Sequence, residues 1–353
     1  MKCICSQKDL KEALIAASKA LPGGKPQMPI LSGIYFVTRK NYLEIHATDF
    51  STGIISKIPA EIESEGEMVV NGKNIVEIVS KLSGNIVTIS TEETENVATI
   101  KSDATTFELY TMEPEDYPKV TMQEFNHTFY IKNAILKNLV TRSVFAVSDD
   151  DSRPVFQGCS ITVSGEDITF VATNTHRLIV TKSVIENNIE GENNLIVPAD
   201  ALSDVLSIVN AIKDERGVKI EFSDKHIAFT INNMIVTCRL IDGSFPAYDR
   251  VIPESCKTFA NVEVQDFVST LGRVAIIANQ TEYNTARISF SNEGLEMKAD
   301  SYATGKVVEH LNADIEGSDV EISFNIRYLQ DFLKTASGND ILRIGVNDSL
   351  TPA

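Results

Sequence analysis

The stretch Val70-Asn71-Gly72-Lys73-Asn74-Ile75-Val76-Glu77-Ile78-Val79 has two counterparts further along the chain. They are Val197-Pro198-Ala199-Asp200-Ala201-Leu202-Ser203-Asp204-Val205-Leu206 and Phe324-Asn325-Ile326-Arg327-Tyr328-Leu329-Gln330-Asp331-Phe332-Leu333, so that positions 71, 198 and 325 correspond at a constant offset of 127. All three carry apolar residues at the i, i+3, i+4, i+7 spacing of a helix that packs by one face. An acid recurs at one place in each copy, as Glu77, Asp204 and Asp331. Three such helices at one offset indicate an internal repeat.

A second helix is predicted before each of these, at 8–21, 132–147 and 264–279, because apolar residues four apart recur there. Short alternating strands, such as 42–47, 168–172 and 294–299, lie between the helices and are separated by turn signals. We therefore predict an α+β fold of three repeated domains, each an antiparallel sheet backed by paired helices. The predicted domains are 1–125, 126–254 and 255–353, joined through continuous sheet edges.

Composition excludes several classes of protein. The 353 residues include 32 Lys and Arg against 49 Asp and Glu, a formal charge of −17. No apolar run approaches the roughly 18 residues of a membrane span, and the amino terminus has no signal-peptide pattern, so we expect a cytoplasmic protein with no membrane partner. The five cysteines are an odd count, with Cys3 and Cys5 two apart and the other three scattered, which indicates a reducing compartment without a disulfide framework or a zinc site. We expect no metal and no cofactor.

Two stretches could be read as catalytic. The run Asp149-Asp150-Asp151 could bind a divalent cation, but it lacks the spacing of a calcium loop, and a solvated loop is the favoured interpretation. His176 stands among threonines and could transfer protons. Because no nucleophile elbow, metalloprotease helix or phosphate loop accompanies it, we interpret His176 as a structural or binding residue. No enzymatic activity is expected.

Basic residues gather on the predicted helices, mostly opposite the apolar stripes. They are Lys8, Lys11, Lys19, Lys73, Lys81, Lys132, Lys137, Arg142, Arg273, Arg327 and Lys334, with Lys25 in the loop after the first helix. Net charge sums the whole surface, whereas DNA responds to the face that it meets. If the helices share one side of the assembly, that side is far more basic than the total implies. Ordinary solubilising charge is the alternative.

Several motifs, in order along the chain, are similar to those of one family. They are Pro29-Ile30-Leu31-Ser32-Gly33-Ile34, Ala47-Thr48-Asp49, Glu115-Asp116-Tyr117-Pro118, Thr173-Asn174-Thr175-His176-Arg177-Leu178 and Asp242-Gly243-Ser244-Phe245-Pro246-Ala247-Tyr248, with Phe324-Asn325 and Tyr328 opening the last helix. Together with the threefold repeat, they make the chain resemble the bacterial β sliding clamps, the processivity subunits of DNA polymerase III, over essentially its whole length.

The resemblance implies a non-catalytic DNA sliding clamp. In this family two three-domain subunits join head to tail and close a ring whose helices line the hole. Such a homodimer encircles duplex DNA without sequence preference and tethers the replicative polymerase, the clamp loader and repair proteins. A basic lining screens phosphates without reading bases, so the ring can slide. We expect association with the nucleoid during replication. A repeat-built scaffold that binds proteins but not DNA is the alternative, because the acidic total fits it.

The resemblance also implies sets of site residues. The partner-peptide pocket corresponds to Phe156, Thr173, Thr175, His176, Arg177, Leu178, Pro246, Arg250, Val251 and Leu350. The dimer seam corresponds to Phe107 and Leu109 of domain one against Ile276 and Ile277 of domain three, unless these four belong to the domain cores. DNA contacts are expected first at Lys25 and Lys73, and then on the helices at Lys137, Arg142, Arg273 and Arg327.

The chain departs from the family pattern in three places. Asn174 stands where the family usually has Asp, Ala199 and Asp200 stand where some relatives are basic, and the acidic run at 149–151 would repel DNA. Each departure weakens a predicted contact rather than the predicted fold.

The repeat also makes a prediction about the end of domain three. Domain one continues from Asn71 to Met112, and the same extent past Asn325 would reach position 366, whereas the sequence ends at Ala353. Domain three is therefore expected to lack its last hairpin, which would strip one wall from the groove beside Leu350. We expect the physiological protein to be longer, and a chain ending here to bind partner peptides poorly.

Overall fold

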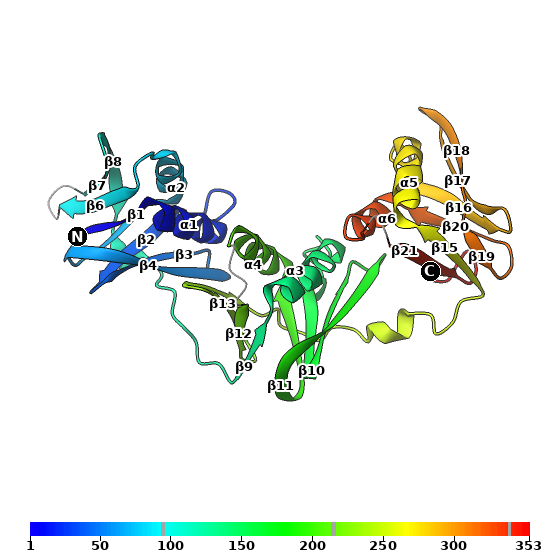
Figure 1. Ribbon diagram of the computed structural model, residues 1–353, viewed down its shortest axis with the longest axis horizontal. Helices are drawn as coiled ribbons and strands as arrows, with labels where there is room; N and C mark the ends of the chain where they lie inside the picture. Colours follow the sequence, from blue (N-terminus) through cyan, green and yellow to red (C-terminus); the bar gives the residue numbers. More distant parts are fainter. Residues whose placement is uncertain (93–95, 213–216, 338–339) are drawn as a thin grey trace. The chain divides into compact units, whose positions relative to one another are not determined.

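The computed structural model describes residues 1–92, 96–212, 217–337 and 340–353, and its elements repeat in three successive stretches (Figure 1). The first contains β1 (Lys2–Ser6), α1 (Gln7–Ala17), β2 (Gly33–Arg39), β3 (Tyr42–Thr48), β4 (Thr52–Ser64), β5 (Glu67–Asn71), α2 (Gly72–Lys81), β6 (Ile86–Glu92), β7 (Val97–Ser102) and β8 (Thr105–Met112). The second contains β9 (His127–Ile131), α3 (Asn133–Thr141), β10 (Gly158–Thr173), β11 (Leu178–Pro198), α4 (Ala199–Ala211), β12 (Val218–Phe222), β13 (His226–Ile231) and β14 (Met234–Arg239). The third contains β15 (Thr258–Glu263), α5 (Val264–Ala278), β16 (Thr285–Ser291), β17 (Gly294–Ser301), β18 (Gly305–Leu311), β19 (Asp314–Glu316), β20 (Val320–Asn325), α6 (Ile326–Leu333) and β21 (Ile341–Val346). Among the described residues, no helix has the length and apolar character to cross a membrane.

The helices follow the predicted repeat. The residues that cap the amino termini of α2, α4 and α6 are Asn71, Pro198 and Asn325, the three positions that correspond in sequence. The side-chain oxygens of the two asparagines accept from backbone N–H groups one turn ahead, which satisfies donors that the first helical turn leaves open. Proline cannot do this, so α4 begins without a side-chain cap. The two helices of each repeat are in contact, as the paired-helix prediction requires.

The first helix of the second repeat is shorter than predicted. It was expected over 132–147, but α3 ends at Thr141, and a 3₁₀ turn, η4 (Val144–Ala146), follows. The Ser143 hydroxyl donates to the Leu139 carbonyl at 2.7 Å, and the Ser143 N–H turns to Val140 instead. A side chain that competes for the last carbonyls tightens the turn and ends the helix.

The first two repeats share one sheet. In the first, eight strands form a closed circuit, since β1 pairs with β6 on one edge and with β4 on the other. The amino-terminal half of β4 also pairs with β14, which extends the sheet to 12 strands through β13 and β12 to β9. The prediction that domains join through continuous sheet edges is therefore confirmed for this junction.

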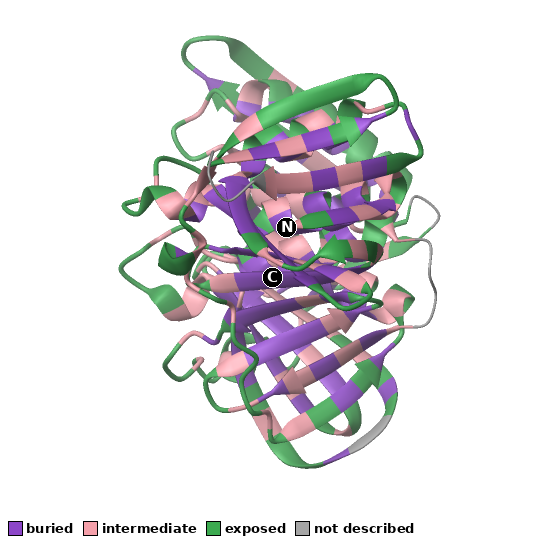
Figure 2. Ribbon diagram, turned by 90° about the vertical axis from the view of Figure 1, so that its left-hand side faces the viewer, coloured by how far each residue is buried: buried purple, intermediate pink, exposed green. Residues whose placement is uncertain are grey.

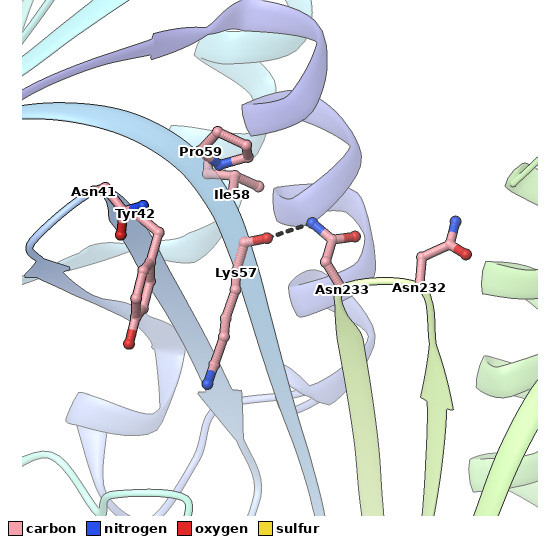
Figure 3. A pocket seen from close by; sticks show the side chains of 7 residues that line it. All are labelled: Asn41, Tyr42, Lys57, Ile58, Pro59, Asn232 and Asn233. Carbon is pink, nitrogen blue, oxygen red and sulfur yellow. Dashed lines mark hydrogen bonds between the residues drawn. The ribbon is translucent and has the colours of Figure 1, made fainter.

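At the junction, β4 changes partner. Cys238 to Met234 of β14 lie opposite Thr52 to Ser56, and β1 pairs with β4 from Ala60 onward. Between these two partners, the Asn233 side chain donates to the Lys57 carbonyl (Figure 3). At Pro59 a backbone N–H would point into this gap. Because proline has no backbone N–H, no donor is left unpaired there. The gap is a hollow of about 590 Å³ that the turns around Asn41 and Asn232 flank.

By contact, the chain forms two compact units: Met1–Asn174 with Ile179–Gly243, and Thr175–Leu178 with Ser244–Ala353. One core runs through the first unit and includes Phe36 from the first repeat and Phe129 from the second. A separate core, with Phe267 and Phe290, fills the second unit. Figure 2 shows buried residues running along the strands while the turns are exposed. The predicted domain limits after residues 125 and 254 stay predictions.

In the described part of the third repeat, two strands have fewer neighbours than their counterparts. There β20 pairs only with β16, and β21 only with β15, whereas β5 lies between β2 and β8 and β6 lies between β1 and β7. Among the described residues, backbone groups on the outer edges of β20 and β21 therefore have no strand to pair with.

Candidate functional site

The segment Thr175–Leu178 packs against α6 within the second unit. Arg177 Nη1 donates to Asp331 Oδ2 at 2.8 Å, and its guanidinium carbon lies 4.6 Å from the centre of the Tyr328 ring. The His176 ring stacks on the same tyrosine, with 6.4 Å between centroids and 21° between planes. Two predicted pocket residues, His176 and Arg177, are thus brought together on one aromatic side chain, which holds the planar guanidinium in a fixed orientation.

The carboxylate of Asp331 pairs with two cations, Arg177 and Lys334. It accepts from Lys334 Nζ at 2.9 Å as well as from Arg177. Burial alone would raise the pKa of Asp331, but the hydrogen bonds from Lys334 and Arg177 outweigh burial and hold it below its usual range. The Arg177 side chain is 17% exposed and that of Lys334 73%, so the bond to Arg177 is the better shielded one.

Sequence reasoning did not connect Tyr328 and Asp331 with Arg177. In the sequence, Tyr328 belongs to a family motif and Asp331 is the recurring acid of the repeat. No local pattern could join either to a residue about 150 positions away, because the contact arises only when Thr175–Leu178 meets α6.

The other pocket residues are less fully assembled. Pro246, Arg250 and Val251 lie at or near the 3₁₀ turn η6 (Tyr248–Val251) and are exposed. Leu350 is 94% exposed, and Asp348 Oδ1 accepts from its backbone N–H at 2.9 Å. Phe156 and Thr173 belong to the first unit, whereas Thr175 and Leu178 belong to the second. The convergence of these residues into one groove stays a prediction.

The two leading candidates for DNA contact lie together. Lys25 and Lys73 line one hollow of about 360 Å³ at the start of α2. Lys137 and Arg142 lie on and just after α3. Arg273 differs, because its guanidinium donates to both carboxylate oxygens of Glu309 at 2.8 Å, so its charge is already compensated. Arg327 Nε donates to Asn279 Oδ1 at 3.3 Å.

The four predicted seam residues divide into two kinds. Phe107 is 38% exposed and Ile276 is 70% exposed. Leu109 and Ile277 are partly buried and pack against the cores of their own units. Sequence reasoning missed three further exposed side chains: Tyr110 on β8, Val308 on β18, and Tyr302 in the turn between β17 and β18. The Arg273–Glu309 pair joins β18 to α5. Packing against a core therefore explains the partial burial of Leu109 and Ile277. It does not apply to Phe107 or Ile276, whose side chains are exposed.

The acidic run forms a self-contained loop. Asp150 accepts from the Ser152 N–H at 3.0 Å and from two nitrogens of Arg153, and Asp151 accepts from Gln157 at 2.7 Å. Within the described residues, no group of three His, Cys, Asp or Glu side chains could hold a metal ion.

Comparison with known proteins gives a single family. Models of the DNA polymerase III beta subunit match in succession: the N-terminal domain at residues 1–121, the central domain at 130–247 and the C-terminal domain at 249–353. A beta sliding clamp from Bacillus subtilis is 29% identical over 357 residues, which cover 98% of this chain and 93% of that protein. The crystal structure of the B. subtilis DNA polymerase sliding clamp has a TM-score of 0.93 at 28% identity, covering 99% of this chain and 94% of that one. A sliding clamp from Pseudomonas aeruginosa, bound to griselimycin, shares the fold, with a TM-score of 0.92 at 24% identity over 99% of this chain and 94% of that one.

Asp331→Asn is expected to destabilise the second unit by about 1–2 kcal/mol at pH 7, because it removes a shielded, charge-assisted bond to Arg177. The pKa of Asp331 is lowered in the folded state, so its stabilising effect is complete above its unfolded pKa and is lost as the pH falls through the folded value. Urea unfolding of the two proteins should therefore differ at pH 7, begin to converge as the pH falls below about 4, and agree once the pH is below the folded pKa of Asp331.

Lys334→Ala is the matched control, since it removes only the exposed partner of Asp331 and should change stability by less than about 0.5 kcal/mol. Equal losses for the two variants at pH 7 would show that the Arg177 bond carries no special weight.

Proposed function

This chain belongs to the family of DNA polymerase III β subunits, the sliding clamps, and we propose that two copies close head to tail into a ring around duplex DNA. The observation that carries the proposal is the succession of three family domains over three structural repeats. In a head-to-tail dimer, each copy contacts the other through two unlike surfaces, and the ring closes after two copies. Three repeats per chain then give six repeats around the ring. The ring tethers the replicative polymerase, the clamp loader and repair proteins, without catalysing a reaction itself, at the nucleoid.

The distribution of charge supports sliding rather than tight binding. Lys25 and Lys73 form no ion pair among the described residues, whereas the chain as a whole carries −17. Uncompensated lysines on a negative protein attract phosphates only over the face that carries them. Contacts through mobile lysines and water set no register on the duplex, so the protein stays on DNA by encircling it.

The protein is therefore expected to stay on nicked circular DNA and to be lost from the same DNA after linearisation. Gel filtration after loading by a clamp loader measures the bound fraction. Lys25→Glu with Lys73→Glu should reduce loading or retention while the dimer stays intact, because the change repels phosphates without touching the seam. Lys81→Ala, which removes a lysine already paired with Glu77, is the control. Equal retention on circular and linear DNA, or none on either, would favour a scaffold that does not encircle DNA.

The exposed apolar side chains on β8 and α5 support a seam between copies. Phe107 and Tyr110 (87% exposed) are proposed to meet Ile276 and Val308 of a second copy. Exposed apolar side chains commonly mark an interface where they gather into one patch. Leu109 and Ile277 are partly buried, and each packs against the core of its own unit next to an exposed strand or helix residue of the proposed seam.

Ile276→Asp should give folded monomers in sedimentation, because each ring would bury the aspartate twice, and burying an isoleucine is worth roughly 1.5–3 kcal/mol per site. Ile276 is a sharper test than Ile277, whose replacement would also disturb the core. Val184→Asp, at a 59% exposed valine on β11, is the control and should remain dimeric. A dimer that survives Ile276→Asp at micromolar concentration would place the seam elsewhere.

We propose that the cluster of His176, Arg177 and Tyr328 forms part of the groove for short peptides of partner proteins. An aromatic face beside a fixed guanidinium offers one apolar and one polar contact, as linear-motif grooves do. The probe is griselimycin, because a related clamp is known with that compound bound.

In isothermal titration calorimetry, Arg177→Ala should weaken griselimycin binding by roughly tenfold, the factor that about 1.4 kcal/mol gives. Arg343→Ala, which removes an arginine stacked on Phe259 in the same unit, should leave binding unchanged. Undiminished binding by the Arg177 variant would remove this residue from the groove.

A further inference from the structure

The hollow that contains Lys25 and Lys73 has an apolar wall. Leu21, Pro22, Pro26 and Pro29 line it together with the two lysines, and its volume is about 360 Å³. That size lies within the range of small-ligand sites, roughly 300–1,000 Å³. Two cations on an apolar wall suit a ligand that is anionic at one end and flat and weakly polar at the other.

The two lysines are available to an anion. Neither forms an ion pair among the described residues, while Lys81, on the same helix as Lys73, pairs with Glu77 at 2.6 Å. An uncompensated pair of ammonium groups beside one hollow favours a phosphate.

The wall distinguishes unpaired from paired DNA. A duplex keeps its bases stacked inside and presents sugar and phosphate, so it would meet the lysines but leave the proline rings unused. An unpaired nucleotide can turn its base against a side-chain surface, and proteins that hold single strands without reading sequence offer aromatic rings for this. Here the proline rings would take the place of the aromatic rings.

We propose that this hollow holds one unpaired nucleotide of single-stranded DNA, with its phosphate between Lys25 and Lys73 and its base against the prolines. The proposal rests on the proposed function, because it assigns a further ligand to a surface already expected to face DNA. A clamp with such a site would pause where duplex gives way to single strand.

The test is fluorescence anisotropy at low salt with a labelled oligothymidylate of about 10 nucleotides, and with a duplex of the same length. Pro22→Ser with Pro26→Ser keeps the charges and should weaken single-strand binding by roughly fivefold, as a loss of about 1 kcal/mol gives, with duplex binding unchanged. Lys25→Ala with Lys73→Ala should weaken both. Lys81→Ala is the control and should alter neither.

A proline variant that binds both DNAs like the wild type would overturn the proposal and reduce the hollow to a phosphate contact. Photocrosslinking of the unaltered chain with a 5-iododeoxyuridine oligonucleotide avoids any effect of substitution on folding. Crosslinks within 21–29 support the proposal, and crosslinks found only elsewhere overturn it. Retention of the proline variant on nicked circular DNA separates the two ideas, since encirclement does not need the wall.

Discussion

The strand β4 joins the strands of the first two repeats into one sheet, and the continuous core of these two repeats depends on that pairing. Its edge away from β3 is shared, with β14 beside its first half and β1 beside its second. A strand that serves two partners leaves a gap between them, and the backbone polar groups there must be satisfied or absent. The Asn233 side chain meets the first requirement and Pro59 the second. As a result, α1 and α4 cover a single continuous core.

The acid that recurs in the repeat has three different roles. Glu77 is exposed and pairs with Lys81 one turn along the same helix. Asp204 is half-buried, and burial raises its pKa to about 6, with Lys19 offsetting only part of the effect. Asp331 binds Arg177 from a distant segment. One position in a repeat thus yields an exposed ion pair, a half-buried carboxylate with a raised pKa and a hydrogen-bond acceptor for a distant arginine, because its neighbours differ.

The acidic total does not describe the local field. Many of the acids are already engaged: Glu309 by Arg273, Asp150 by Arg153 and Glu186 by Lys132. Such exposed pairs contribute little to stability, but they leave few net charges on their part of the surface. Among the described residues Lys25 and Lys73 form no ion pair, so they add positive charge beside the hollow at the start of α2. A protein with a charge of −17 can in this way present a cationic face.

The sequence by itself determined the repeat with its corresponding positions 71, 198 and 325, the paired-helix domains and the family. These depend on apolar periodicity, which acts within a few helical turns, and on motifs that are read directly from the chain. Tertiary structure decided which of Ile276 and Ile277 points outward, which acid holds Arg177, and that Lys25 and Lys73 share a hollow. Such contacts join residues far apart in the chain, and they follow from strand register and helix packing, which no local pattern encodes.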